Sequence, residues 1–207
     1  MAPSRVAGSG ARALRTVGHA VALAPGLLLV VFYATGGLGP WPAREAVLWT
    51  GRIAIALLVG SLAPTVIARL AGWPVVLVLR REWGLYGFKY ALAHLVVQVA
   101  LDYGGAVGLW AADVLPKWHA LMGMASFLLM VPLAITSAPG WVQRLGPWWK
   151  RLHRLAYVAA AAAVVHYVWT VKSARTGPYL AAGALVVLLG ARLVLYLRGR
   201  RAAPREA

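Results

Sequence analysis

Six long apolar runs, separated by short connections rich in arginine, constrain this chain more than any other feature. A helix needs about 20 mostly apolar residues to span a bilayer, and every run has close to that length. Only 13% of the residues are charged, whereas a soluble domain averages about a quarter. The sequence therefore predicts an all-α integral membrane protein, a six-transmembrane-helix bundle. The runs cover Val17 to Tyr33, Thr50 to Ala68, Leu85 to Tyr103, Trp118 to Thr136, Leu152 to Val171 and Pro178 to Leu197.

The charge of the connections predicts the orientation of this bundle. Arginine and lysine gather before the first run, in the second and fourth connections and after the last run, and the other connections carry fewer of them. Cytoplasmic loops carry this excess of positive charge, so we expect a bacterial inner-membrane protein with both termini in the cytoplasm. Residues 1–16 and 198–207 are predicted to be basic cytoplasmic tails, and residues 17–197 form the transmembrane domain. We expect any soluble redox domain to belong to another chain.

The net charge and the absence of cysteine exclude several classes of function. The formal net charge is +16, but the basic residues lie between apolar runs and form no single face. This distribution fits contact with anionic lipid head groups and argues against nucleic-acid binding. The chain contains no cysteine, which excludes disulfides, iron–sulfur clusters and thiolate nucleophiles.

Three histidines, His94, His153 and His166, lie inside or at the mouth of the apolar runs. An ionisable residue in hydrocarbon is costly and indicates a functional site by default. His153 and His166 lie thirteen residues apart on one run, or roughly 20 Å along a helix, so they cannot share one metal ion. His94 matches His166 in depth, and we predict that these two are the axial pair of a b-type haem. His153 is shallower, and it serves a second haem, marks the point where electrons enter, or is an ordinary interfacial residue.

Other residues have weaker signals. His19 and His119 lie at the ends of runs and are predicted to be interfacial residues. Arg80 and Arg81 precede the third run, either as a cytoplasmic anchor or as a grip on a haem propionate, a flavin phosphate or a quinone oxygen. The alanine run 159–163 leaves room for a flat macrocycle or for a closely packed helix. No internal repeat is evident from the residue types.

Short motifs in order along the chain carry a resemblance to a known family. They are Thr50-Gly51, Gly72-Trp73-Pro74, Arg80-Arg81-Glu82-Trp83-Gly84-Leu85, Tyr90-Ala91-Leu92-Ala93-His94, Leu133-Ala134-Ile135-Thr136-Ser137, Leu145-Gly146, Trp149-Lys150-Arg151-Leu152-His153-Arg154-Leu155 and His166-Tyr167-Val168-Trp169. The set resembles the MsrQ (YedZ) family, the haem-binding membrane subunits of the periplasmic methionine sulfoxide reductase system, within the ferric-reductase-like transmembrane superfamily. The first and last runs match that family only as hydrophobic helices.

This resemblance implies a function. It implies that His94, His153 and His166 are haem-associated, that the haem is b-type and that FMN is also bound. Electrons would come from the quinone pool or a cytoplasmic flavin reductase and pass to a periplasmic molybdopterin subunit, which forms a heterodimer with this chain and repairs oxidised proteins. The chain departs from the family at Leu115-Pro116-Lys117-Trp118-His119, where a polar loop containing Arg-Pro is expected. The partner is therefore the least constrained part of the prediction.

Two alternatives remain open from the sequence. One is a stand-alone transmembrane reductase of ferric chelates or oxygen species. The other, of a different class, is a non-redox transporter or scaffold that uses the histidines as proton relays, although the scarcity of acidic residues inside the apolar runs counts against a relay. No side chain is placed as a general acid, a general base or a nucleophile, so we expect an electron-transfer subunit of an oxidoreductase system.

Overall fold

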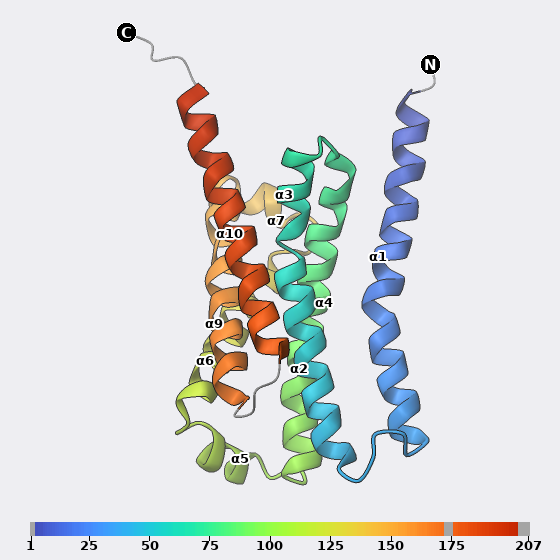
Figure 1. Cartoon of the computed structure of the whole chain (residues 1–207), viewed down its shortest axis with the longest axis vertical. Coiled ribbons are helices and arrows are strands. Elements are labelled where there is room, and N and C mark those ends of the chain that lie inside the picture. Colours follow the sequence, from blue (N-terminus) through green and yellow to red (C-terminus); the bar gives the residue numbers. More distant parts are fainter. Residues whose placement is uncertain (1–2, 172–175, 203–207) are drawn as a thin grey trace.

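The computed structural model describes residues 3–171 and 176–202, and these residues form helices and no strands (Figure 1). This confirms the predicted all-α class. The six longer helices are α1 (Pro3–Ala34), α2 (Pro42–Gly60), α4 (Val78–Val97), α6 (Trp118–Ile135), α9 (Leu155–Thr170) and α10 (Thr176–Ala202). The shorter elements are α3 (Ala63–Leu70), η1 (Pro74–Leu77), η2 (Gln98–Asp102), α5 (Val107–Val114), α7 (Trp141–Leu145) and α8 (Pro147–Leu152).

Five segments of the described residues are long and apolar enough to cross a membrane, where the sequence predicts six. They are Gly10–Ala34, Pro42–Leu70, Pro74–Asp102, Trp118–Ile135 and Thr176–Gly199. The predicted span that has no counterpart among these five is the fifth, Leu152 to Val171. It corresponds to α9, which has 16 residues and is shorter than the roughly 20 that a span needs. The span is shortened because α8 ends at Leu152 and the chain turns at His153 and Arg154 before α9 begins. The protein is a multi-pass membrane protein.

The helices extend further than hydropathy predicts. The first helix begins at Pro3 and α2 begins at Pro42, several residues before the apolar runs at Val17 and Thr50. Proline is favourable in the first turn of a helix because its missing N–H needs no partner there, and Glu45 in the same turn complements the helix dipole. Hydropathy therefore locates the spans but misses helix ends that carry polar residues.

Two helix pairs, α2 with α4 and α6 with α9, form the centre of the bundle through close backbone contacts. A Cβ atom at Gly87 on α4 would lie 3.3 Å from the carbonyl oxygen of Ala54 on α2. In the other pair, Ser126 donates a hydrogen bond of 2.8 Å from its hydroxyl to the carbonyl of Ala159, which is fully buried. Small residues allow membrane helices to approach this closely. Ala159 and Ala160 thus serve helix packing, one of the two interpretations of the alanine run.

The main apolar core lies where these pairs meet α10. Its buried members are Ile55, Leu58, Val59, Leu62, Met130, Ala159, Ala160, Val164 and Leu185. The outward faces of the helices remain apolar and exposed, as on α1, where Leu27 and Val30 are both 65% exposed. Such faces suit contact with lipid, since a helix that is apolar all round belongs in hydrocarbon or in a large core.

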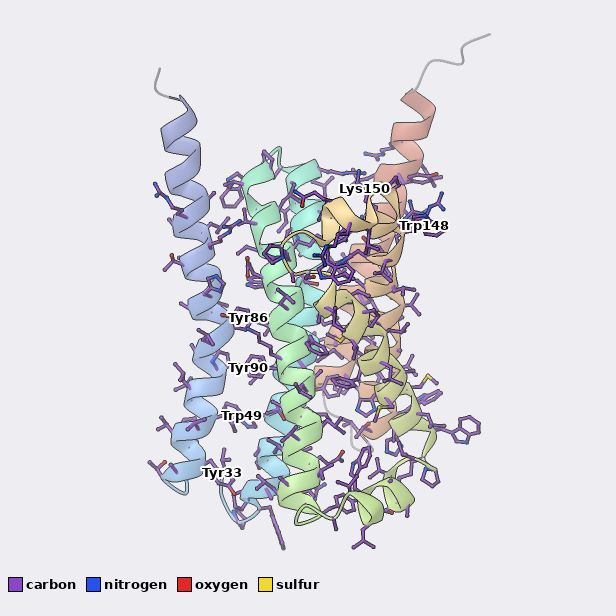
Figure 2. All side chains as sticks on the ribbon, turned by 180° about the vertical axis from the view of Figure 1, so that it is seen from behind. Tyr33, Trp49, Tyr86, Tyr90, Trp148 and Lys150 are labelled. Carbon is purple, nitrogen blue, oxygen red and sulfur yellow. The ribbon has the colours of Figure 1, made fainter. Side chains whose placement is uncertain are left out.

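The first helix is joined to α4 by polar side chains. Figure 2 shows Tyr86 and Tyr90 on α4 pointing towards α1. Tyr90 donates a hydrogen bond of 2.8 Å to the carbonyl of Ala22, and Tyr86 lies 3.0 Å from Nδ1 of His19. His19 therefore pairs with a tyrosine between α1 and α4. Helix α1 begins and α10 ends at the same end of the bundle (Figure 1).

Candidate functional site

His94 on α4 and His166 on α9 face each other across the bundle. Their ring centroids lie 6.4 Å apart and their planes are inclined by 74°. If imidazole binds a metal at about 2 Å, as it does zinc, two rings on opposite sides of one ion have centroids roughly 6 to 6.5 Å apart. The structure thus brings together the pair that the sequence predicts, at the separation that a shared metal ion requires.

Both imidazoles are held in one orientation by backbone carbonyls. Nδ1 of His94 lies 2.9 Å from the carbonyl oxygen of Val47, and Nδ1 of His166 lies 2.6 Å from that of His119. A carbonyl oxygen can only accept a hydrogen bond, so Nδ1 carries the hydrogen in each ring and Nε2 keeps its lone pair. Metal-binding histidines in proteins are oriented in this way. Both side chains are therefore prepared to donate to a metal ion through Nε2.

Glycines make room for the two rings. A Cβ atom at Gly51 on α2 would lie 3.0 Å from Nδ1 of His94, and one at Gly123 on α6 would lie 2.8 Å from Nδ1 of His166. Contacts that short would force the rings to move. In the sequence, Gly51 stands out only as part of the Thr50-Gly51 motif, and nothing marks Gly123.

The two histidines share one supporting arrangement, which the sequence analysis missed. His94 follows Val47 by 47 residues, and His166 follows His119 by the same number; in each case the carbonyl of the earlier residue accepts the hydrogen bond. Gly51 lies four residues after Val47, and Gly123 lies four residues after His119. The glycine and the carbonyl are therefore one helical turn apart on the partner helix in both pairs. The equal spacing is a local repeat between α2/α4 and α6/α9. It could have been found by comparing residue spacings instead of residue types.

The cavity between these histidines is narrow and mostly apolar. It measures about 210 Å³, below the roughly 300–1,000 Å³ of typical ligand pockets. Met124 and Met130 line it, and unbranched methionine side chains can repack to admit a flat ring. Ala163 also lines it. The C-terminal end of the alanine run therefore borders the site, whereas the N-terminal end serves helix packing. The donor set and the separation of the rings fit a haem, provided that these side chains move.

His119 lies at this site, although the sequence suggested an interfacial residue. Its ring centroid is 6.3 Å from that of His166 and its carbonyl accepts the hydrogen bond of that residue. His119 also lines the cavity. Its position at the first turn of α6 makes it look interfacial in the sequence, but packing of α6 on α9 turns it towards the pair.

His153 lies at the opposite end of the bundle, where α7 and α8 lie (Figure 1). Its ring stacks on Trp149 with centroids 3.9 Å apart, and its Nε2 lies 3.1 Å from the hydroxyl of Thr136. That hydroxyl donates its single hydrogen to the carbonyl of Pro132 at 2.6 Å. It can therefore only accept from Nε2 of His153, which ties up the nitrogen that is free in His94 and His166.

His153 borders a second cavity of about 500 Å³, here called the inner cavity. In the part of the chain that the structure describes, five positively charged side chains line it and no aspartate or glutamate does. The two arginines that the sequence selected are among the five, so the structure brings them together with His153. The positively charged lining residues are Arg80, Arg81, Lys150, Arg154 and Arg192.

Arg80 and Arg81 are both engaged by neighbouring oxygens. Arg80 donates hydrogen bonds to the hydroxyl of Thr65 at 2.6 Å and to that of Tyr157 at 3.0 Å. Arg81 donates twice to the carbonyl of Ser137, at 2.9 and 2.5 Å. These contacts fix two guanidinium groups at the wall of the inner cavity, where planar forks suit a carboxylate or a phosphate.

The comparisons with known proteins agree with this arrangement. Residues 50–164, more than half of the chain, match the family described as ferric reductase like transmembrane component. The chain is 40% identical over 201 residues to the protein-methionine-sulfoxide reductase heme-binding subunit MsrQ of Xanthomonas axonopodis pv. citri (strain 306), covering 94% of this chain and 92% of the relative. The chain belongs to the MsrQ family. A second MsrQ, from Rhodospirillum rubrum, is 40% identical over 180 residues, covering 84% of this chain and 86% of the relative.

The extent of the match adds to what the motifs suggested. The MsrQ relatives align over nearly the whole chain, so their similarity reaches beyond the central motifs to the outer helices. The ferric-reductase-like match itself contains His94 and His153 and ends shortly before His166. The family predicted from the motifs is thereby confirmed.

Proposed function

We propose that this protein is a b-type cytochrome subunit that carries electrons across the bacterial inner membrane to a periplasmic methionine sulfoxide reductase. The observation that carries this proposal is the pair His94 and His166, whose rings face each other at 6.4 Å with both Nδ1 atoms held by carbonyls. These two residues would bind the haem iron as axial ligands. The iron supplies one-electron chemistry when bound, and the protein supplies ligands, orientation and burial.

The orientation follows from the charges and the helix ends. We propose six spans, with α9 as the fifth in chain order, and both termini in the cytoplasm. Helices α1 and α10 begin and end at one end of the bundle, which agrees with an even number of spans (Figure 1). Arg80, Arg81 and Lys150 lie at this end, as the positive-inside rule requires of the cytoplasmic side.

This orientation assigns a direction to the two sites. The inner cavity with His153 faces the cytoplasm, and the pair His94 and His166 lies nearer the periplasm. Electrons from the quinone pool or a cytoplasmic flavin reductase would enter at the inner cavity, which holds either a second haem or FMN. They would leave through His94 and His166, here called the outer pair, to a periplasmic subunit that contains molybdopterin. The relatives are named as subunits of a methionine sulfoxide reductase, which supports this partner.

An absorption spectrum of the purified protein tests the haem. We expect a Soret band and a low-spin spectrum, because two neutral imidazoles give six-coordinate iron. His94→Ala and His166→Ala should each abolish the low-spin spectrum, whereas His19→Ala, which removes a histidine paired with Tyr86, should leave it unchanged. A protein without a Soret band, expressed with ample haem, would contradict every cytochrome interpretation and leave the transporter or scaffold.

Electron delivery to a purified periplasmic methionine sulfoxide reductase tests the partner. The reduced protein should be reoxidised by that subunit when methionine sulfoxide is present. Reoxidation by ferric chelates or oxygen without transfer to the subunit would instead identify a stand-alone reductase.

A further inference from the structure

We propose that Arg192, on α10, binds the acidic arm of a cofactor in the inner cavity, through a carboxylate or a phosphate group. This rests on the proposed function, since it assumes that the inner cavity holds a redox group. Arg192 lies in the last apolar run, where the sequence shows a single arginine and no motif. It lines the inner cavity from α10, together with Arg80 and Arg81 from α4.

The guanidinium of Arg192 has a donor without a partner. Its Nη1 is buried, and among the buried side-chain nitrogen and oxygen atoms of the described residues it is the one that makes no hydrogen bond. The group lies over the ring of Tyr157, with the guanidinium carbon 4.7 Å from the ring centroid. A cation–π contact stabilises the charge but leaves the N–H groups at the edge unpaired. The side chain as a whole is half-buried, but a buried donor without a partner is costly, so a partner for Nη1 is expected.

None of the described residues supplies that partner. Among residues 3–171 and 176–202, no aspartate or glutamate lines the inner cavity. The hydroxyl of Tyr157 already accepts a hydrogen bond from Arg80, and the carbonyl of Ser137 already accepts two from Arg81. Glu82 lies 3.8 Å from Arg81, so its carboxylate is paired with a different lining residue. Positive charges that share a cavity repel one another, so an anion from outside the chain fits there.

The shape of the cavity favours an acidic group on a flat ring. Its volume of about 500 Å³ lies within the range of cofactor pockets. His153 and Trp149 form a stacked aromatic wall, with planes inclined by 26°, and Tyr157 adds a third ring. A planar ligand can lie against these rings while its acidic arm reaches the guanidinium groups. Haem propionates and the flavin phosphate of FMN share this chemistry.

The test replaces the charge of Arg192 and follows both cofactors. Purified Arg192→Met is compared with Arg198→Met, an exposed arginine on the same helix, and with Arg192→Lys, which keeps the charge but loses the fork. Haem per protein is measured as the pyridine haemochrome, and FMN by fluorescence after acid release. Each variant is then stripped and titrated with haem and with FMN. Loss of one charge-assisted hydrogen bond should weaken one of these cofactors about 10- to 100-fold.

The cofactor that weakens identifies the source of the acidic group. Arg192→Lys should lie between wild type and Arg192→Met, and Arg198→Met should match wild type. The low-spin spectrum of the outer pair should persist in all three variants. Its persistence separates a failure of this proposal from a failure of the proposed function, which would appear as unaltered spectra in His94→Ala and His166→Ala.

Stability gives a second measurement that a purely structural arginine would not reproduce. Without cofactor, Arg192→Met should be at least as stable as wild type in detergent, because a buried donor that has no hydrogen-bond partner is removed. With the cofactor added, the variant should gain less stability than wild type, because it binds the ligand more weakly. Wild-type affinity of Arg192→Met for both cofactors would overturn the proposal. Equal weakening in Arg198→Met would overturn it as well. So would a change in Arg192→Met that is confined to the amount of co-purified phospholipid, measured as phosphorus.

Discussion

The outer pair of histidines and the inner cavity differ in what holds their side chains. At the outer pair, two carbonyls fix both rings, two glycines make room for them and the lining is mostly apolar. At the inner cavity, one histidine stacks on a tryptophan and hydrogen bonds through Nε2, amid five positive charges. The outer pair is prepared for a metal ion in one geometry. The inner cavity is prepared for negative charge, and its histidine must release Thr136 before it can bind a metal through Nε2.

The largest effect is expected from closing the space beside the outer pair. In Gly123→Ala the new methyl group would lie 2.8 Å from Nδ1 of His166, so the ring must move away from its carbonyl. We expect loss of the low-spin spectrum nearly as complete as in His166→Ala. Gly51→Ala, with a contact of 3.0 Å to Nδ1 of His94, should cause a smaller loss.

Gly183→Ala on α10 is the matched control, because a Cβ atom there meets nothing within 4 Å. It should keep the spectrum and gain up to about 1 kcal/mol of stability, since alanine favours helix over glycine. Equal spectra in Gly123→Ala and Gly183→Ala would show that the histidine does not depend on this space.

The next largest effect should separate the two sites. His153→Ala removes the inner histidine and leaves both outer carbonyls and both glycines in place, so the low-spin spectrum of the outer pair should persist. If electrons pass through the inner cavity, a reduced quinone analogue should reduce the haem of the outer pair at least about tenfold more slowly. A tenfold change in rate corresponds to about 1.4 kcal/mol of activation free energy. Stopped-flow absorption measures this rate. Loss of the low-spin spectrum as severe as in His94→Ala would argue against the pairing of His94 with His166.

The contrast between the sites also explains what the sequence could predict. Hydropathy and depth are properties of single helices, and they were sufficient to locate five of the predicted spans and to match His94 with His166. The supporting groups of the outer pair are backbone carbonyls, which have no residue identity, so Val47 and His119 look unrelated in the sequence. Arg192 was missed for a different reason. A single charge barely lowers the hydropathy of its run, and the packing of α10 decides which cavity it faces.

A smaller effect is expected at the contact between α6 and α9. Ser126→Ala removes the hydrogen bond to the carbonyl of Ala159, and should cost about 1 kcal/mol of stability, as a buried hydrogen bond usually does. In the α2/α4 pair, Ala54 and Gly87 are also 33 residues apart, and they correspond to Ser126 and Ala159. Ala54 has no hydroxyl, so that pair already packs without the bond. Thr35→Ala, which removes an exposed hydroxyl bonded to its own helix, is the control. Unfolding in mixed detergent measures both, and equal losses would contradict a specific role for Ser126.

The smallest effect is expected outside the spans, at the end of the bundle that carries α5. The Tyr103 hydroxyl donates to Asp113, and Lys117 lies 2.9 Å from the same carboxylate. Hydrogen bonds from Tyr103 and Lys117 lower the pKa of Asp113. The hydrogen bond between Tyr103 and Asp113 raises the pKa of Tyr103 to about 12. The stabilisation from Tyr103 is therefore complete below pH 10 and is lost as the pH rises through about 12. That from Asp113 is present above its ordinary pKa and is lost as the pH falls through the lowered value.

Neither the outer pair nor the inner cavity includes these residues, so the spectra of both sites should not change as Tyr103 or Asp113 titrates. Asp113→Asn should return the pKa of Tyr103 towards its ordinary value of 10. The ultraviolet absorbance of tyrosinate measures this change, with Tyr103→Phe identifying the signal. An unchanged tyrosine titration in Asp113→Asn would show that the carboxylate does not hold this hydroxyl. A spectral change that follows the tyrosine titration would mean that this end of the bundle is coupled to the outer pair, and the two sites could no longer be treated as independent of it.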